Sequence, residues 1–273
     1  MAQQESRLRE RRGRDRERAA GAGPGHDLVF TDRVIATLVI LRFQLPHAAL
    51  AQFCGVDRST ITRAVHEIRP LLAARGFAVP GSPGRRLRTL AGVFAYAAAE
   101  GVILRVDGTE VQVRRPRANR PGRRAFVSGK RKQNTKKATV ITGPGGRTLR
   151  AGAFRPGRMH DQTALKTEGI CDLFERFPRV KALVDAGYRG LARQFPDQVT
   201  APPLKPGKDA PPCGVASWEI SRKAQSSQRI PAGHANAEHK QWRTLQRYTG
   251  RREYYDETHR AIAGLVSDRA ARR

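Results

Sequence analysis

Three acidic residues occupy positions from which they could do chemistry together. Asp107 follows an apolar run at 102–106, Asp185 follows a second apolar run at 180–184, and Glu238 lies on a predicted helix far downstream. Carboxylates gathered in one place repel one another and need a cation to offset that repulsion. A pair of divalent ions held between carboxylates supports phosphoryl transfer. The three acids therefore predict metal-dependent chemistry on a polyanionic substrate.

Asp107 also has a simpler explanation. It is followed by Gly108, and Asp-Gly is a strong signal for a tight hairpin turn, so the segments 102–106 and 110–114 would be two paired strands. Asp185 argues for more than a turn, because turn formation alone gives no reason for both aspartates to end strands. Both interpretations of Asp107 stay open on the residues alone.

The chain is strongly basic. Its formal net charge is +28, from 52 Lys and Arg against 24 Asp and Glu, which exceeds what solubility requires and indicates a nucleic-acid partner. Residues 114–137 contain eleven Lys and Arg, and no Asp or Glu occurs from 111 to 160. A solvated charge run is the common alternative, but folded domains usually mix both signs. The residues predicted to contact DNA here are Arg114, Arg115, Arg123, Arg124, Lys130, Arg131, Lys132, Lys136 and Lys137.

Other classes of protein are disfavoured. The cysteines Cys54, Cys171 and Cys213 are scattered and lack the CxxC spacing of a zinc site. No apolar run reaches the roughly 18 residues that a membrane-spanning helix needs, and the charged N-terminus lacks the apolar segment of a signal peptide. We therefore expect a cytoplasmic, nucleoid-associated protein without a membrane partner.

The elements that must position these residues begin with a helical region at 27–79, preceded by a stretch at 1–26 that we interpret as a disordered basic arm. A helix ending before Pro46, a short helix at 47–53, a glycine turn and a polar-faced helix from residue 57 follow one another. This order is typical of a helix-turn-helix, whose second helix enters the DNA major groove. A purely structural helical hairpin is the alternative. The residues that would face DNA are Arg58, Ser59, Thr60 and Arg63.

A linker with a connecting helix is predicted at 80–100, and the main domain at 101–273. Strands at 138–142 and 148–154, joined by a Gly-Pro-Gly-Gly turn, would form an antiparallel meander with the first hairpin. One further helix is predicted in the tail, 251–273.

A helix at 161–177 precedes the apolar strand at 180–184, and such a crossover favours parallel pairing with a strand of the same sheet. If that neighbour is the strand at 102–106, both strands end at one edge. Asp107 and Asp185 would then lie side by side.

Two further acids need placing. Asp161 is well placed to be the N-cap of its helix, and the neighbouring His160 is expected to be structural, although it could touch a phosphate or a metal. Glu238 lies on a helix expected from Ala232, where it could point towards the sheet edge or pair with Arg243 at the surface.

The segments VDGTEV, FVSGKRKQNTKKATVIT, GRMHD, LVDAGYRG and AEHKQW occur in this order. Together they closely resemble the Harbinger-like domain of DDE-type insertion-sequence transposases of bacteria, and the region from Asp27 resembles the helix-turn-helix that those proteins carry. The resemblance implies an α/β fold with a ribonuclease-H-like mixed sheet, and two divalent metal ions, usually Mg²⁺ with Mn²⁺ as the alternative. It assigns catalysis and metal binding to Asp107, Asp185 and Glu238, with Asp161 as the alternative second acid.

The resemblance also implies a function. His160 and Tyr188 lie within the matched motifs as auxiliary candidates, and His234 stands where an arginine is expected before the glutamate. An insertion-sequence transposase would bind double-stranded DNA at inverted repeats and at the target, cleave and transfer strands, and assemble as a homo-oligomer on DNA. A catalytically inactive DNA-binding derivative and a nuclease that never joins strands are the alternatives.

Overall fold

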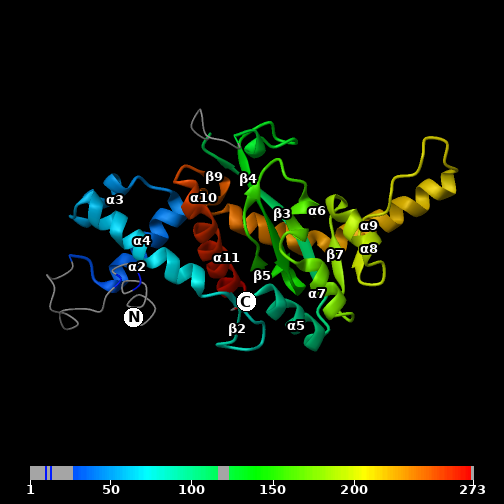
Figure 1. The fold of residues 1–273 in the computed structure, drawn as a ribbon, viewed down its shortest axis with the longest axis horizontal. Helices are drawn as coiled ribbons and strands as arrows, with labels where there is room; N and C mark the ends of the chain where they lie inside the picture. Colours follow the sequence, from blue (N-terminus) through cyan, green and yellow to red (C-terminus); the bar gives the residue numbers. More distant parts are fainter. Residues whose placement is uncertain (1–9, 11–12, 14–26, 116–122, 272–273) are drawn as a thin grey trace.

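The computed structural model describes residues 10, 13, 27–115 and 123–271 of the 273-residue chain. Figure 1 shows a group of helices at one end, a twisted sheet in the middle, and a long helix that crosses the sheet and projects beyond it. The C-terminal helix lies between the helical group and the sheet (Figure 1). The predicted basic arm falls outside the described residues apart from Glu10 and Gly13.

The helical region contains α2 (Phe30–Phe43), α3 (His47–Cys54) and α4 (Arg58–Ala74). Helix α3 ends at Gly55, whose φ of 62° is a left-handed conformation that glycine adopts without strain. Apolar residues of the three helices, among them the fully buried Ile61, form a core of their own. The predicted order of helix, glycine turn and second helix is confirmed.

The segment between the two regions is structured. Strands β1 (Phe77–Ala78) and β2 (Arg86–Leu87) pair antiparallel, and α5 (Leu90–Glu100) follows where a helix was expected. Thr89 caps this helix by accepting a 3.0 Å hydrogen bond from the backbone N–H of Gly92. The Pro- and Gly-rich stretch is therefore the loop of a small hairpin.

In the described part of the chain, seven strands form one mixed sheet with the order β5-β4-β3-β7-β8, while β6 pairs with β4 and β9 with β3. The first three strands along the chain form an antiparallel meander, and β7 joins β3 in parallel after a helical crossover. This sheet confirms the mixed α/β, ribonuclease-H-like fold class. The strands are β3 (Leu104–Val113), β4 (Thr135–Thr142), β5 (Thr148–Ala151), β6 (Arg155–Pro156), β7 (Ala182–Val184), β8 (Val199–Thr200) and β9 (Arg247–Tyr248).

The hairpin predicted at Asp107 is wrong. Asp107 and Gly108 lie inside the single long strand β3, where they pair with Val140 and Thr139 of β4. The turn of the meander comes after β3, at residues that include η1 (Arg123–Phe126). An Asp-Gly pair favours a turn only where no neighbouring strand binds its backbone, and here β4 does.

Helices cover the sheet, and two predicted boundaries are wrong. The helix expected at 161–177 is broken at Gly169, whose φ of 74° is not helical. The helix expected from Ala232 begins at Pro212 instead and continues through Pro231. The helical segments are η2 (Pro144–Gly146), α6 (Asp161–Lys166), α7 (Ile170–Arg176), η3 (Ala186–Tyr188), α8 (Arg189–Gln194), α9 (Pro212–Lys240), α10 (Arg243–Gln246), η4 (Arg252–Tyr254) and α11 (Tyr255–Ala271).

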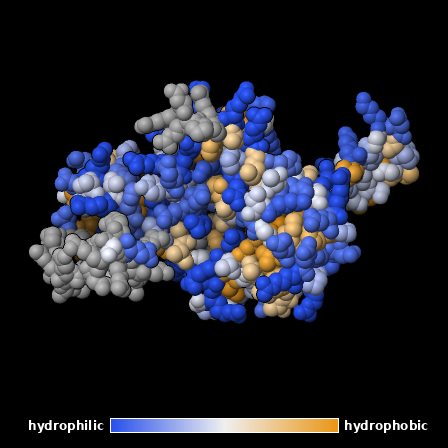
Figure 2. Space-filling view, in the orientation of Figure 1, coloured by the Kyte–Doolittle hydropathy of each residue, from blue (hydrophilic) through white to orange (hydrophobic). Residues whose placement is uncertain are grey.

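The helical region is joined to the sheet domain through α11. Apolar residues of α2 and α11, among them Leu41 and the fully buried Tyr255, share one core cluster with β3 and β4. Arg69 of α4 also forms a 2.9 Å ion pair with Glu257 of α11, and its side chain is only 7% exposed. Figure 2 shows that hydrophilic residues cover most of one face of the molecule. Within the described residues, no helix is long and apolar enough to cross a bilayer.

Candidate active site

Asp107 and Asp185 come together at the edge of the sheet that lies along the strand ends, where β7 stops beside the continuing β3. Val106 of β3 pairs in parallel with Val184 of β7, so that the next residue on each chain is an aspartate. Strand β7 ends at this point, whereas β3 continues with Asp107 opposite Val140 of β4. The crossover connection thus brings side by side two residues that are far apart in the sequence.

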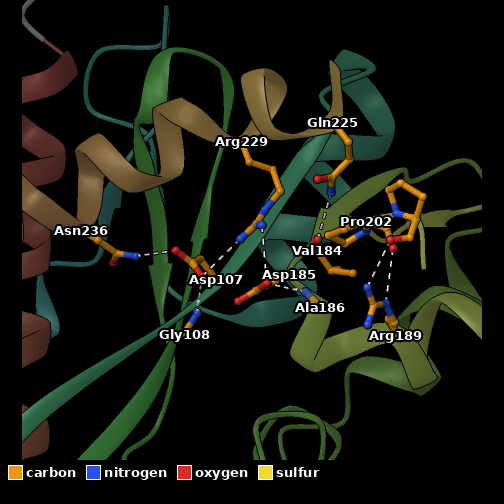
Figure 3. A network of polar contacts seen from close by, with 11 residues as sticks. Asp107, Gly108, Val184, Asp185, Ala186, Arg189, Pro202, Gln225, Arg229 and Asn236 are labelled. Carbon is orange, nitrogen blue, oxygen red and sulfur yellow. Dashed lines mark hydrogen bonds and ion pairs between the residues drawn. The ribbon is translucent and has the colours of Figure 1, made fainter. Parts of the chain in front are cut away.

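Arg229 of α9 points between the two aspartates (Figure 3). Its Nη2 lies 3.5 Å from Oδ1 of Asp107, and its Nη1 lies 3.6 Å from Oδ1 of Asp185. The side chains of Arg229 and Asp107 are 19% and 21% exposed, while that of Asp185 is 49% exposed. One guanidinium therefore offsets the repulsion between two carboxylates, and the site opens to solvent on the side of Asp185.

The Asp107 carboxylate is hydrogen-bonded on both oxygens. Its Oδ1 accepts a 2.9 Å bond from the backbone N–H of Gly108, and its Oδ2 accepts a 2.8 Å bond from the amide of Asn236. Burial raises the pKa of the Asp107 carboxyl, and the nearby Asp185 raises it further. Arg229, Gly108 and Asn236 lower this pKa but do not cancel the rise. Asp107 therefore holds a proton more readily than an exposed aspartate does.

Two contacts fix α9 over this edge. The Gln225 amide donates a 3.1 Å hydrogen bond to the carbonyl oxygen of Val184, directly before Asp185 (Figure 3). Further along the helix, the carbonyl oxygen of Pro231 lies 2.3 Å from the position that a Cβ on Gly146 would occupy, so only glycine fits in that turn. Helix α9 is therefore packed closely against its surroundings at Gln225, before Arg229, and at Pro231, between Arg229 and Asn236.

Tyr188 lies among three aspartates. Its hydroxyl is 3.2 Å from the position that a Cβ on Gly108 would occupy, and a carboxylate oxygen of Asp161 is 4.0 Å from the same point. Burial raises the pKa of the Tyr188 phenol far above its ordinary range, and Asp161, Asp107 and Asp185 raise it further. Tyr188 is therefore a neutral hydroxyl beside the acids.

Asp161 is engaged by a neighbouring cation. Its Oδ1 lies 2.8 Å from Nζ of Lys137, and its Oδ2 lies 3.2 Å from the position that a Cβ on Gly187 would occupy. The N-cap role predicted for Asp161 is wrong, because Asp161 is already the first helical residue of α6. His160 is the cap, and its Nδ1 accepts a 3.4 Å hydrogen bond from the backbone N–H of Gln162.

Glu238 faces elsewhere. Its Oε1 lies 3.7 Å from Nη2 of Arg269 on α11, and not beside Arg243 as the surface alternative predicted. It follows Arg229 by nine residues, which is about 180° around an α-helix, so Arg229 and Glu238 point to opposite sides of α9. In the part of the chain that the structure describes, no three His, Cys, Asp or Glu residues are arranged to hold a metal.

The basic stretch divides into internal and surface residues. Lys137 contacts Asp161, and Lys136 lies 3.5 Å from Asp256, with both lysine side chains at most 15% exposed. Arg131 is exposed and lies 3.7 Å from Glu110. The side chain of Arg123 lies outside the described residues. The exposed basic residues on this stretch are Arg114, Arg115, Arg124, Lys130, Arg131 and Lys132.

The second helix of the helix-turn-helix presents its polar face to solvent. Arg58, Ser59 and Arg63 are exposed, and Thr60 is half-buried. The guanidinium of Arg63 donates a 3.3 Å hydrogen bond to the Thr60 hydroxyl. His234, the auxiliary candidate, is an exposed residue of α9 and does not belong to the helix-turn-helix.

Sequence reasoning missed the two residues of α9 that contact Asp107. Neither Arg229 nor Asn236 was predicted to be a site residue. Both contact Asp107, and their separation of seven residues is about two helical turns. A polar pair at this spacing, placed in a helix that must cross the end of the sheet, is the signal that could have found them.

The residues at this edge fit only part of the metal centre that the resemblance implies. Mg²⁺ and Mn²⁺ take oxygen ligands such as carboxylates, and Asp107 and Asp185 can supply them. The third predicted carboxylate, Glu238, pairs with Arg269, and the guanidinium of Arg229 already contacts both aspartates. The described side chains thus form a two-carboxylate edge with a built-in cation.

Two family models match the chain. One, described as a DDE superfamily endonuclease, matches residues 106–267, and the other, described as the helix-turn-helix of DDE superfamily endonuclease, matches residues 26–78. No curated protein matches. The chain is also similar to a structure titled "Mos1 transposase paired-end complex with left transposon end", at 14% identity and a TM-score of 0.26, over 96% of this chain and 82% of the other. A structure titled "Crystal structure of the mariner Mos1 paired end complex with Mg" is similar at 13% identity and a TM-score of 0.23, over 97% and 84%.

Proposed function

Because this chain belongs to the DDE superfamily endonuclease family, whose model matches residues 106–267, we propose that it acts as the transposase of an insertion sequence. In this proposal the helix-turn-helix binds double-stranded DNA at the inverted repeats of the element. The sheet edge at Asp107 and Asp185 serves DNA strand cleavage and strand transfer. A homo-oligomer assembled on DNA would hold the two ends together.

The pairing of Asp107 with Asp185 carries the proposal. The fold brings together two carboxylates from distant segments, although their repulsion makes this costly unless a positive charge accompanies them. A structural role alone does not require a second acid at the same edge. We propose Asp107 and Asp185 as metal ligands, with Mg²⁺ as the cation and Mn²⁺ as its substitute, and Asp161 as a neighbouring acid held by Lys137.

DNA binding rests on a separate part of the chain. The exposed Arg58, Ser59 and Arg63 lie at the start of α4, the position from which a helix-turn-helix contacts bases and phosphates. The net charge of +28 favours the approach of DNA to the whole chain. The exposed residues from Arg114 to Lys132 would add contacts to the phosphate backbone.

One experiment separates binding from cleavage. The full-length chain is incubated with a labelled duplex that carries the inverted repeat of its element, with Mn²⁺ or with EDTA. A transposase retards the duplex in both conditions and nicks it only with Mn²⁺, and Asp107→Asn removes nicking but not binding. A joined product with target DNA distinguishes a transposase from a nuclease that never transfers strands.

A second candidate function is DNA binding without catalysis. The observation that favours it is the position of Glu238, which pairs with Arg269 instead of joining the two aspartates. In this case the duplex is retarded with the same affinity by the wild-type chain and by Asp107→Asn, and neither produces nicks. A chain that fails to bind the duplex at all would exclude both candidates.

A further inference from the structure

Helix α9 presents a single stripe of residues to the aspartates. Arg229 and Asn236 both contact Asp107 and are separated by about two helical turns. Residue 233 lies between them, four positions after Arg229 and three before Asn236, and this spacing places helical residues on one face. Residue 233 is Gly233. The segment of α9 that crosses over Asp107 therefore has one position without a side chain.

Nothing in the packing requires a glycine at this position. Apart from the backbone of α9 itself, a Cβ built on Gly233 would meet no atom of the described residues within 4 Å, and the φ of Gly233 is outside the left-handed region. The residue is exposed, so that the space beside it opens to solvent. Glycine inside a helix is destabilising relative to alanine. Gly146 is different, because there the carbonyl oxygen of Pro231 leaves no room for a Cβ.

The acid closest in sequence cannot take this place without a large rotation of the helix. Glu238 follows Gly233 by five residues, which is about 140° around an α-helix, and it pairs with Arg269 of α11. Turning α9 to bring Glu238 over Asp107 would break the hydrogen bond from Asn236 and the one from Gln225 to Val184.

We propose that residue 233 is the position from which α9 would complete a three-carboxylate site for a divalent cation with Asp107 and Asp185, and that Gly233 leaves this site incomplete. The inference rests on the proposed function, because it takes the two aspartates as metal ligands. Arg229 supplies the positive charge at the edge instead. In this proposal the wild-type chain holds Mg²⁺ or Mn²⁺ only weakly.

The test is to add the missing carboxylate. Mn²⁺ binding to the full-length chain is measured by electron paramagnetic resonance for the wild type, for Gly233→Glu and for Gly233→Gln, which has the same size without the charge. Gly233→Glu is expected to tighten Mn²⁺ binding on the order of tenfold or more, since the affinity of oxygen-ligand sites rises with the number of charged ligands. Gly233→Gln is expected to bind Mn²⁺ as the wild type does.

Two further variants make the assignment specific. Asp107→Asn in the Gly233→Glu background should remove the gain in Mn²⁺ affinity, because the added glutamate would then lack its partner. Glu238→Gln represents the competing assignment. The proposal is overturned if Gly233→Glu and Gly233→Gln bind Mn²⁺ equally, or if Glu238→Gln weakens Mn²⁺ binding by the wild type as much as Asp107→Asn does.

DNA readouts distinguish this inference from the proposed function. With the inverted-repeat duplex, Gly233→Glu is expected to nick DNA in Mn²⁺ faster than the wild type and Gly233→Gln, while all three bind the duplex equally. If the duplex is bound but Gly233→Glu gains neither Mn²⁺ affinity nor nicking, the inference at residue 233 fails alone. If Mn²⁺ affinity rises but no variant binds the duplex, the inference holds and the transposase function fails.

Discussion

Nη1 of Arg229 lies 3.6 Å from Oδ1 of Asp185, and Nη2 of the same guanidinium lies 3.5 Å from Oδ1 of Asp107. The two aspartates are thus neutralised in part by a residue of the same chain. Because the cation belongs to α9, the charge balance of the sheet edge and the position of that helix depend on each other.

Replacing Arg229 with glutamine should destabilise the metal-free chain by about 1 kcal/mol, a modest value because the ion pairs are long and Asp185 is half exposed. Added Mn²⁺ should recover part of that loss by occupying the place of the guanidinium. The measurement is the melting temperature in EDTA and in Mn²⁺. Lys223→Gln, an exposed change on the same helix, is the control. Equal melting temperatures for the two variants would show that the aspartates do not need the arginine.

Gly146→Ala should be more damaging than Gly145→Ala. Both glycines have positive φ, 75° and 64°, so both substitutions carry a backbone strain of about 1 kcal/mol. A Cβ at Gly146 would lie 2.3 Å from the carbonyl oxygen of Pro231, whereas a Cβ at Gly145 would meet no atom of the described residues within 4 Å. We expect an additional loss of about 1–3 kcal/mol for Gly146→Ala, measured by urea unfolding. Equal losses would mean that α9 moves away from the turn freely.

Arg63→Ala should weaken binding to DNA and reduce the slope of log affinity against log salt by about 1, as expected for the loss of one phosphate contact. Arg63 is exposed on the polar face of α4, and its only hydrogen bond within the described residues goes to Thr60, so folding should be little affected. The measurement is a salt titration of duplex binding. Arg193→Ala, which removes an exposed arginine from α8, is the matched control. Identical slopes for the two variants would argue against α4 as the DNA-contacting helix.

His259→Phe should increase stability and flatten its dependence on acid pH. His259 is fully buried between Phe154 and Tyr255, and neither ring nitrogen has a hydrogen-bond partner among the described residues. Burial lowers the pKa of His259 well below its ordinary value of 6.5. Below pH 6.5 the unfolded chain therefore binds a proton that the folded chain does not, and the free energy of unfolding falls by about 1.4 kcal/mol per pH unit.

The measurement is urea unfolding from pH 7 to pH 5, where His259→Phe should lose less stability than the wild type on acidification. His234→Gln changes an exposed histidine of α9 and serves as the control. If the free energy of unfolding falls with acidification as steeply in His259→Phe as in the wild type, groups other than His259 cause that fall.

The relation between the strands could be predicted from the sequence. Two apolar runs that each end in aspartate, with a helix between them, leave few options other than parallel pairing at one edge, and Val106 does pair with Val184. The turn assigned to Asp107 could not be corrected from the sequence. A Cβ on Gly108 would lie 3.2 Å from the Tyr188 hydroxyl, a tight approach that favours glycine, and that approach joins residues far apart in the chain.

The orientation of α9 was harder to predict. Ala235 and Trp242 would share one face of a helix that continued through Trp242, and Glu238 could then point towards the sheet, but α9 ends at Lys240. Trp242 therefore gives no information about which face of α9 is buried. Ala232, Ala235 and His239 are the buried residues near this end, and they turn Glu238 towards Arg269 instead.

Helix α4 carries exposed arginines near its first residue and, further along, Arg69 in its ion pair with Glu257 of α11. In the proposed function, a base pair bound at the start of α4 would therefore lie at a fixed distance from Asp107. The number of base pairs between the recognised sequence and any cut would be dictated by this rigid spacing. Inserting or deleting one base pair in that interval would rotate the scissile phosphate away from the protein by about a tenth of a DNA turn.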